Sequence, residues 1–294
     1  MQYSIENEFI RLTVESKGAE VYSVVNKHTG AEMLWNGDPE VWPRRAPILF
    51  PYTGKLTGGK MIAKGLEYQG PQHGFARDVE HTLVRHTDDV LEFELHADSQ
   101  TLPIWPYAFV LRSTFTLEER TVHHKLTVEN PVEPMLRFGI GFHPGFVIPF
   151  DDKHTTEDYE FRFDEIESPL CVSALPDGLL EGNHYYYLAR NTRRIPLTDD
   201  LFDNDSHCMV NLRSKSLAIV EKDTGRRVSC DIEGYPYVLI WSKPIKPLRF
   251  VCIEPWQSLT GEANGPLEWE SRPCAASLKQ GESWSTTMST TFDR

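Results

Sequence analysis

The sequence has no apolar run that approaches the length of a membrane span. Its first residues, Met1 to Glu6, lack the basic segment and apolar core of a secretory signal. Basic residues are in the minority, with 30 Lys and Arg against 43 Asp and Glu and a formal net charge of −13. This balance disfavours nonspecific binding to nucleic acid or to an anionic membrane surface. We therefore expect neither nucleic acid nor membrane as a partner.

Cysteine is also scarce and shows no paired spacing. The five cysteines are an odd number and contain no CxxC pair. Cys252 lies inside an apolar run, where a buried thiol behaves as a small hydrophobic group. Because no secretion signal is visible, we expect reduced thiols and a cytoplasmic location.

Several familiar catalytic patterns are missing. The sequence has no HExxH, no GxSxG and no P-loop. His123 and His124 are adjacent, so in a strand they point to opposite faces and cannot bind one metal ion together. We therefore expect no metal site. A carboxylate pair for glycoside hydrolysis stays open, because a sequence does not give the distance between carboxyl groups.

Helical periodicity is weak, whereas alternation of apolar and polar residues is strong. This period of two is typical of half-buried strands. Residues 118–121 read as the connection of a hairpin between two of these segments. The expected strands lie at residues 10–14, 91–97, 109–117, 122–128 and 284–292.

The arrangement of these strands predicts one domain. Twenty prolines and nineteen glycines are scattered along the chain and mark no linker, and no internal repeat is visible. Regular strands separated by turn residues favour a sandwich or a barrel, and the length favours a large one. We predict an all-β protein, a large antiparallel β-sandwich that occupies residues 1–294 as a single domain.

A run near the C-terminus combines an apolar strand with a carboxylate. Residues 250–253 are apolar, Glu254 follows, and then come Pro255 and Trp256. An ionised Glu there is unfavourable unless a polar site receives it. Because proline cannot continue a central ladder, we expect the strand to end after Glu254 and to present it to a cleft. A structural ion pair with an arginine is the alternative.

His143 stands in a similar context, since it ends an apolar segment and is followed by Pro144. Two such strand ends can face each other across a cleft of a sandwich. A carboxylate and an imidazole in that position form a general base and a general acid. Their mutual attraction is expected to keep Glu254 ionised and to favour protonated His143 near neutral pH.

Four short motifs occur in a characteristic order and spacing along the full length of the chain, namely Pro47-Ile48-Leu49-Phe50-Pro51, His73-Gly74-Phe75, His143-Pro144 and Glu254-Pro255-Trp256. With these motifs the chain resembles the aldose 1-epimerase (mutarotase) family, in particular its shorter bacterial mutarotase-like branch. The family fold is a large antiparallel β-sandwich. The resemblance implies interconversion of the α and β anomers of a free or phosphorylated aldose, without a cofactor.

The resemblance also implies roles for single residues. Glu254 would take the proton from the C1 hydroxyl while His143 protonates the ring oxygen. His73 would hydrogen-bond the sugar, and an aspartate would bind its hydroxyls, with Asp205 as the first choice and Asp203 as the second. Trp256 would stack on a sugar face, and a packing role is equally open for it.

The sequence departs from the family at one place. Better-known members carry an arginine pair after the glycine that aligns with Gly54, where this chain has Lys55. Arg45 or Arg77 could replace the missing arginine, since Lys does not provide the same bidentate geometry. Together with Arg44, these cations would also suit a sugar phosphate.

Two further functions stay open at this point. One is a non-catalytic sugar-binding or sugar-sensing protein on the same sandwich, which needs fewer exactly placed groups than catalysis. The other is a hydrolase or lyase on a related sandwich. In each case the partner is a small sugar or sugar phosphate, and the chain is a monomer or a homodimer.

Overall fold

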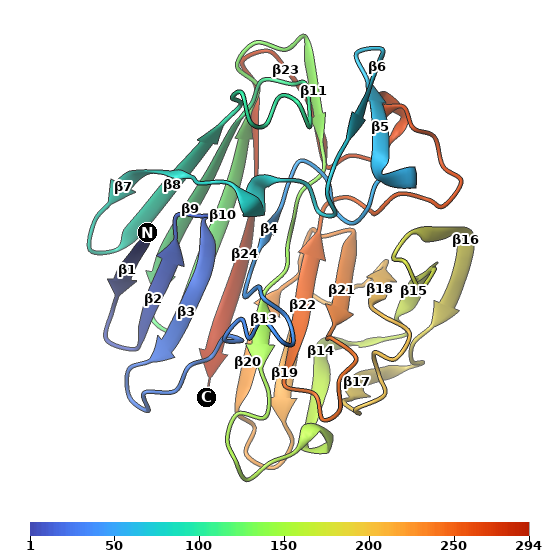
Figure 1. Ribbon diagram of the computed structural model, residues 1–294. Coiled ribbons are helices and arrows are strands. Elements are labelled where there is room, and N and C mark those ends of the chain that lie inside the picture. Colours follow the sequence, from blue (N-terminus) through green and yellow to red (C-terminus); the bar gives the residue numbers. More distant parts are fainter. Residues whose placement is uncertain (294) are drawn as a thin grey trace.

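The computed structural model describes residues 1–293, which form 24 strands and four short 3-10 turns (Figure 1). Each strand pairs with its neighbours in antiparallel fashion. The prediction of an all-β antiparallel fold is confirmed. The 3-10 turns are η1 (Thr57–Gly59), η2 (Ala76–Asp78), η3 (Thr156–Asp158) and η4 (Trp269–Ser271).

Two large sheets carry most of the chain. The first has nine strands in the order β17-β14-β19-β20-β24-β10-β9-β8-β7. In chain order its strands are β7 (Thr82–His86), β8 (Val90–His96), β9 (Val110–Glu118), β10 (Thr121–Glu129), β14 (Tyr159–Glu167), β17 (Thr192–Pro196), β19 (Ser216–Glu221), β20 (Arg227–Asp231) and β24 (Ser283–Asp293).

The second large sheet runs in the order β16-β15-β18-β21-β22-β12-β4, and β13 also pairs with β22. Figure 1 shows β13, β22 and β21 side by side in this sheet. Its strands are β4 (Ile48–Leu49), β12 (Gly141–Phe142), β13 (Gly145–Val147), β15 (Leu170–Ala174), β16 (Leu180–Tyr187), β18 (His207–Val210), β21 (Tyr237–Trp241) and β22 (Phe250–Trp256).

Three smaller sheets complete the described part of the chain. They contain β1 (Gln2–Glu6), β2 (Ile10–Glu15) and β3 (Glu20–Asn26), then β11 (Met135–Phe138) with β23 (Ala276–Lys279), and β5 (Lys60–Ala63) with β6 (Leu66–Gln69). Every strand expected from the alternation exists. The expected hairpin connects β9 to β10 through a turn in which Glu119 adopts a positive φ of 47°.

The two large sheets share one apolar core. Phe161 of β14 and Ile219 of β19 belong to the same buried cluster as Val251 and Ile253 of β22. Side chains alternate across a strand, so the remaining residues of β22 lie on the other face of its sheet. This sheet therefore has one face against the core and one that can carry a binding site. Within residues 1–293 we find no helix long and apolar enough to cross a membrane.

The strand β22 corrects one expectation. It does not end after Glu254 but continues through Pro255, which pairs with β21. On its other side, however, β22 pairs with β12 only through Gly141, and pairing resumes in β13 at Gly145. A proline has no N–H to donate and is tolerated where a ladder is interrupted in this way.

Candidate active site

A cavity of about 470 Å³ lies on the outer face of the second large sheet. Strands β21 and β22 form part of its wall through Leu239, Trp241, Glu254 and Trp256, the residues that alternate with those in the core. A volume of several hundred cubic ångströms is typical of sites that bind small molecules. Seven of the eight residues expected from the sequence line this cavity, namely Glu254, His143, His73, Asp205, Arg77, Lys55 and Trp256.

His143 and Glu254 lie side by side in the cavity wall. The pairs Gly141–Trp256 and Gly145–Cys252 share one register, and continuing it places His143 opposite Glu254. The Nε2 atom of His143 is 3.3 Å from Oε2 of Glu254. The expectation that the two face each other across a cleft is therefore corrected, because both belong to one sheet and are direct neighbours. Nor does Glu254 pair with an arginine within residues 1–293.

Two glycines allow the chain to pass so close to the site. A Cβ at Gly141 would come within 2.7 Å of Cδ1 of Trp256. A Cβ at Gly145 would lie 2.9 Å from Cζ3 of Trp42. Both distances are shorter than side-chain atoms tolerate, so the two indoles can pack against this backbone only because the glycines have no side chain.

Burial shifts the pKa of both Glu254 and His143 toward the neutral forms. Glu254 is 2% exposed, and burial, with the nearby Asp205 charge as a second cause, raises its pKa well above the ordinary value. Burial, with Arg77 as a second cause, lowers the pKa of His143. Burial therefore opposes the expected ionised Glu254 and protonated His143. Desolvation disfavours both charges and outweighs their mutual attraction.

In these neutral forms one proton is available to two basic atoms, Oε2 of Glu254 and Nε2 of His143. In the neutral form that proton is on the carboxyl of Glu254, whose Oε2 lies 3.3 Å from Nε2 of His143. Transfer of that proton over this short distance would convert the pair into a carboxylate and an imidazolium. The Trp256 indole lies close enough to Glu254 to lower its pKa, although its Nε1–H makes no hydrogen bond of normal geometry to the described residues.

His73 lies beside this pair as a neutral hydrogen-bond donor. Its Nδ1 accepts a hydrogen bond from the backbone N–H of Gly54 at 3.0 Å, so the ring proton is assigned to Nε2, whose partner at 3.2 Å is the side-chain amide of Gln72. Burial, followed by the charges of Arg77 and other neighbouring groups, lowers the pKa of His73 well below its ordinary value. Its ring centroid lies 5.6 Å from that of His143.

The structure separates the candidate arginines. Arg77 lines the cavity, and its Nη2 donates to the carbonyl of Gln72 at 2.7 Å. Arg45 does not line the cavity; its guanidinium lies 3.8 Å over the ring of Tyr22 and donates to the Tyr22 carbonyl. The expectation that Arg45 binds substrate is therefore corrected. Its neighbour Arg44 lines the cavity, whereas the side chain of Arg45 points away from it toward Tyr22.

The two aspartates are also distinguished. Asp205 lines the cavity and is close enough to Glu254 to raise its pKa. Its φ of 74° is unusual for a residue other than glycine, and aspartate is among the residues that tolerate it. Asp203 lies outside the cavity and forms an ion pair with Lys246 at 3.0 Å. Of the two candidates, Asp205 is the one in the site.

Trp256 is mainly a packing residue, since it is only 4% exposed and belongs to a buried cluster with Leu49 and Leu239. Sequence reasoning missed two other tryptophans in the cavity wall. Trp42 stacks on His143, with centroids 5.0 Å apart, and Trp241 contacts the same ring edge-on at 5.4 Å. Trp42-Pro43, just before Arg44, combines the same two residue types as Pro255-Trp256 in reverse order, and this similarity could have indicated Trp42.

The fold and the cavity together define a β-sandwich of the galactose mutarotase-like class. The chain belongs to the aldose 1-epimerase family, whose model matches residues 1–291. Protein LacX, plasmid, of Lactococcus lactis subsp. lactis is 30% identical over 267 residues, which cover 88% of this chain and 89% of LacX.

Solved structures agree with this assignment. A galactose mutarotase related enzyme from Lactobacillus acidophilus has a TM-score of 0.95 and 30% identity, covering 100% of this chain and 98% of that chain. A galactose mutarotase-like protein from Lactobacillus casei ATCC 334 has a TM-score of 0.91 and 28% identity, covering 99% of both chains. The resemblance expected from the four motifs is confirmed.

Two groups of side chains in the described part of the chain bring possible metal ligands together. His143, Cys252 and Glu254 offer ligand atoms within 4.8 Å of one another. Burial, with the neighbouring Glu254 charge as a second cause, raises the pKa of the Cys252 thiol well above its ordinary value, which opposes the thiolate that a metal needs. A neutral thiol beside a proton-sharing pair is a poor metal site.

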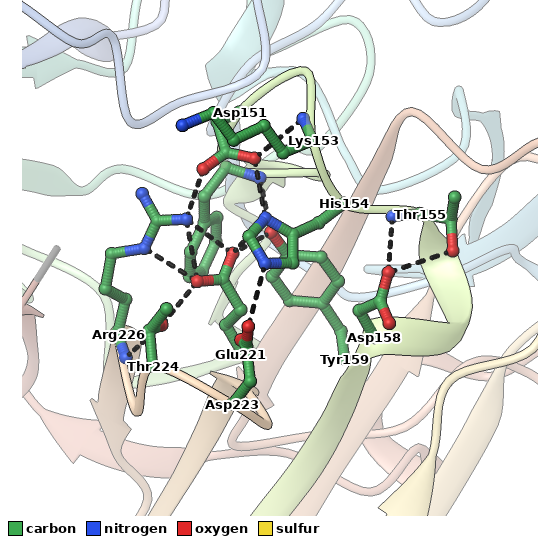
Figure 2. A network of polar contacts seen from close by, with 11 residues as sticks. Asp151, Lys153, His154, Thr155, Asp158, Tyr159, Glu221, Asp223, Thr224 and Arg226 are labelled. Carbon is green, nitrogen blue, oxygen red and sulfur yellow. Dashed lines mark hydrogen bonds and ion pairs between the residues drawn. The ribbon is translucent and has the colours of Figure 1, made fainter.

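The second group lies outside the cavity. Figure 2 shows the carboxylates of Asp151 and Glu221 between the guanidinium of Arg226 and the ring of His154. Arg226 donates to both carboxylate oxygens of Glu221 at 2.7 Å, and His154 lies 2.6 Å from Asp151. The arginine already supplies the positive charge that these carboxylates require. The cluster is best described as an ion-pair network that joins the segment before η3 to the hairpin of β19 and β20.

Proposed function

We propose that the protein is an isomerase of the aldose 1-epimerase type that interconverts the α and β anomers of an aldose. The observation that carries the proposal is the contact of His143 Nε2 with Glu254 Oε2 at 3.3 Å inside a cavity of about 470 Å³. A general base and a general acid that share one proton are what ring opening of a hemiacetal requires.

The side-by-side arrangement suits this reaction. The C1 hydroxyl and the ring oxygen O5 are bonded to the same carbon, so the groups that act on them must also be neighbours. After the shared proton moves to His143, Glu254 removes the C1 hydroxyl proton and the electrons of that O–H bond form the C1 carbonyl. The C1–O5 bond breaks, and O5 takes a proton from His143.

Rotation about the C1–C2 bond then presents the other face of the aldehyde. The same two residues act in reverse, and the ring closes to the opposite anomer with no net change in protons. Each positioned acid or base contributes roughly 10²–10⁴-fold to the rate, and orientation of the substrate adds to this. The cavity supplies His73, Arg77 and Asp205 for sugar hydroxyls and Trp42 for an apolar sugar face.

The direct test is the anomerisation of freshly dissolved α-glucose, α-galactose and their 6-phosphates, followed by polarimetry against the uncatalysed rate. Wild-type protein is expected to accelerate at least one of them, and Glu254→Gln to lose most of that acceleration. Equal rates for wild type and Glu254→Gln with every sugar would reject the proposal.

A non-catalytic sugar-binding protein is the second candidate. It is favoured by the pKa directions of Glu254 and His143, because they oppose the carboxylate and imidazolium that the proposed ring opening uses. Calorimetric binding of a sugar whose anomerisation is not accelerated would support this candidate over the isomerase. In either case we propose a cytoplasmic location, in keeping with five cysteines that are all free thiols.

A further inference from the structure

A second cavity, of about 30 Å³, lies in the interior of the sandwich. Strands β10 and β24 of the first large sheet, β12 and β13 of the second, and β3 contribute to its wall. All the lining residues are buried, and their side chains are apolar except for those of His124, His143 and Thr290. The cavity is large enough to hold a water molecule, which is stable in such a place only where polar partners surround it.

His143 separates this interior cavity from the candidate active site, because it lines both. Its Nε2 lies 3.3 Å from Oε2 of Glu254 in the larger cavity. Its other ring nitrogen, Nδ1, is buried and makes no hydrogen bond of normal geometry to the described residues, although the His143 backbone lies close enough to act on the pKa of the ring. Nδ1 therefore needs a partner that residues 1–293 do not supply.

His124 of β10 has a matching nitrogen. The Nε2 of His124 is buried and takes part in no hydrogen bond within the described part of the chain. The ring stacks on Phe115, with centroids 4.1 Å apart, and meets Phe142 edge-on at 5.0 Å. These two rings hold the imidazole of His124 in place, and Phe142 directly precedes His143 in the chain. Buried nitrogens without a partner are rare in proteins, and an ordered water often satisfies them.

The protonation states of the two rings suit one bridging water. Because Nε2 of His143 has to accept a proton in the proposed reaction, the ring proton of neutral His143 is on Nδ1, which is then a donor. Burial lowers the pKa of His124 to about 3, so near pH 7 its ring is neutral and one of its nitrogens is an acceptor. Thr290 offers a third partner, since its hydroxyl otherwise has only a 3.8 Å contact with the thiol of Cys230. Three partners are typical of a buried water.

We propose that the interior cavity binds one water molecule, which accepts a hydrogen bond from Nδ1 of His143 and donates one to Nε2 of His124, and that His124 positions the imidazole of His143 through this water. The positioning role rests on the proposed function, whereas the water site does not. During ring opening His143 becomes an imidazolium, and a charged N–H forms a stronger hydrogen bond than a neutral one. The water therefore stabilises the charged form of His143 more than the neutral form.

The water site is tested by structure and by NMR, without any measurement of activity. A high-resolution crystal structure of the wild-type protein is expected to show one water within hydrogen-bond distance of Nδ1 of His143 and Nε2 of His124. In protein labelled with ¹⁵N-histidine, both rings should be neutral and protonated at Nδ1, with signals assigned from His124→Gln and His143→Gln. A cavity without water density, or a His143 ring protonated at Nε2, would overturn the proposal whether or not the protein is an isomerase.

The positioning role is tested by kinetics. His124→Phe keeps the size of the ring but removes the acceptor, so kcat is expected to fall roughly tenfold while KM is unchanged, because the hydrogen bond strengthens only after the sugar is bound. His124→Gln, whose side-chain amide reaches the position of Nε2, should restore most of kcat. Thr290→Val, which removes the third partner, should lower kcat in the same direction even if His124→Phe does not fold.

Met288→Leu is the matched control, since it changes the wall of the same cavity without removing a polar atom. Its kcat should equal that of wild type. An equal loss of kcat in Met288→Leu and His124→Phe, or wild-type kcat in both His124→Phe and Thr290→Val, would reject the positioning role. If the wild-type protein accelerates no sugar, the proposed function and the positioning role both fail, and the density and the ring protonation still decide the water site.

Discussion

Glu254 of β22 and His143 at the end of β12 stand opposite each other in one sheet register, with Oε2 and Nε2 3.3 Å apart. The chain between them builds the strands from β13 to β21, so no local pattern sets this contact. The register places both side chains on the face away from the core. The chemistry proposed for the protein depends on this one pairing.

Replacing Glu254 by Gln should abolish most catalysis and leave the fold intact. The amide keeps the size of the side chain and can still donate to His143, but it cannot act as a base. We expect kcat to fall by about 10²–10⁴-fold, measured by polarimetry. The midpoint of thermal unfolding should not fall, because no buried charge loses its partner. A strongly destabilised protein would instead indicate that the carboxyl is structural.

Asp205 and Asp203 should respond differently to the same substitution. Asp205→Asn is expected to raise KM by about tenfold or more, because a charged acceptor for sugar hydroxyls is lost. Asp203→Asn breaks only an exposed ion pair with Lys246, worth at most about 1 kcal/mol. It serves as the control, and its kinetics should match those of wild type. Similar KM values for both variants would remove Asp205 from the binding site.

Two tryptophans of the cavity should separate stability from binding. Trp256→Ala should destabilise the protein by about 3–5 kcal/mol, since a large buried side chain leaves a void. Trp42 is only partly buried and lies on the His143 ring, so Trp42→Ala should act mainly through a higher KM. Urea unfolding and initial-rate kinetics on both variants measure the two effects. If Trp256→Ala has the free energy of unfolding of wild type but a raised KM, Trp256 is a sugar-binding residue and not a packing residue.

The buried His124 should make the protein sensitive to acid. Burial lowers its pKa to about 3, and its ring stacks on Phe115 at 4.1 Å between centroids. The unfolded chain binds a proton near pH 6.5 and the folded one does not, so stability present at pH 7 is lost as pH falls below 6.5 toward 3.

The variant His124→Phe measures this effect. It removes the titrating group, and at pH 5 the penalty that it removes is about 2 kcal/mol. The stability of His124→Phe relative to wild type, from urea unfolding, should therefore rise by about that amount between pH 7 and pH 5. If the difference in stability between His124→Phe and wild type were the same at pH 7 and pH 5, the pKa of His124 would not change on folding.

The ion-pair network in Figure 2 should contribute to stability and not to catalysis. Glu221 is completely buried and receives two hydrogen bonds from Arg226, so Arg226→Met leaves a buried carboxylate without its main partner. Because the guanidinium is itself about one third exposed, we expect a loss of about 2–3 kcal/mol. Arg249→Met, which breaks an exposed pair with Asp38, is the control. Neither variant should change KM.

Much of the fold and part of the site could be predicted from the sequence. Alternation of apolar and polar residues is a local property, since each strand has one face in the core. It therefore indicated β2, β8, β9, β10 and β24 and the all-β architecture directly. The four ordered motifs indicated His73, His143 and Glu254, because a polar residue at the end of an apolar segment needs a special environment.

Other features depend on tertiary contacts between distant segments. Arg44 and Arg45 are adjacent, yet Arg44 lines the cavity and Arg45 stacks on Tyr22. The strand β22 passes through Pro255 because β12 and β13 leave its ladder interrupted there, which the residues of β22 do not reveal.

The sequence by itself determined the strands, their inward faces and the choice of Glu254 and His143 as candidate acid–base residues. The tertiary structure alone decided that Glu254 and His143 are direct neighbours and that burial favours their neutral forms. The physical reason is range: alternation acts between residues two positions apart, whereas desolvation and strand register depend on what the rest of the chain packs around them.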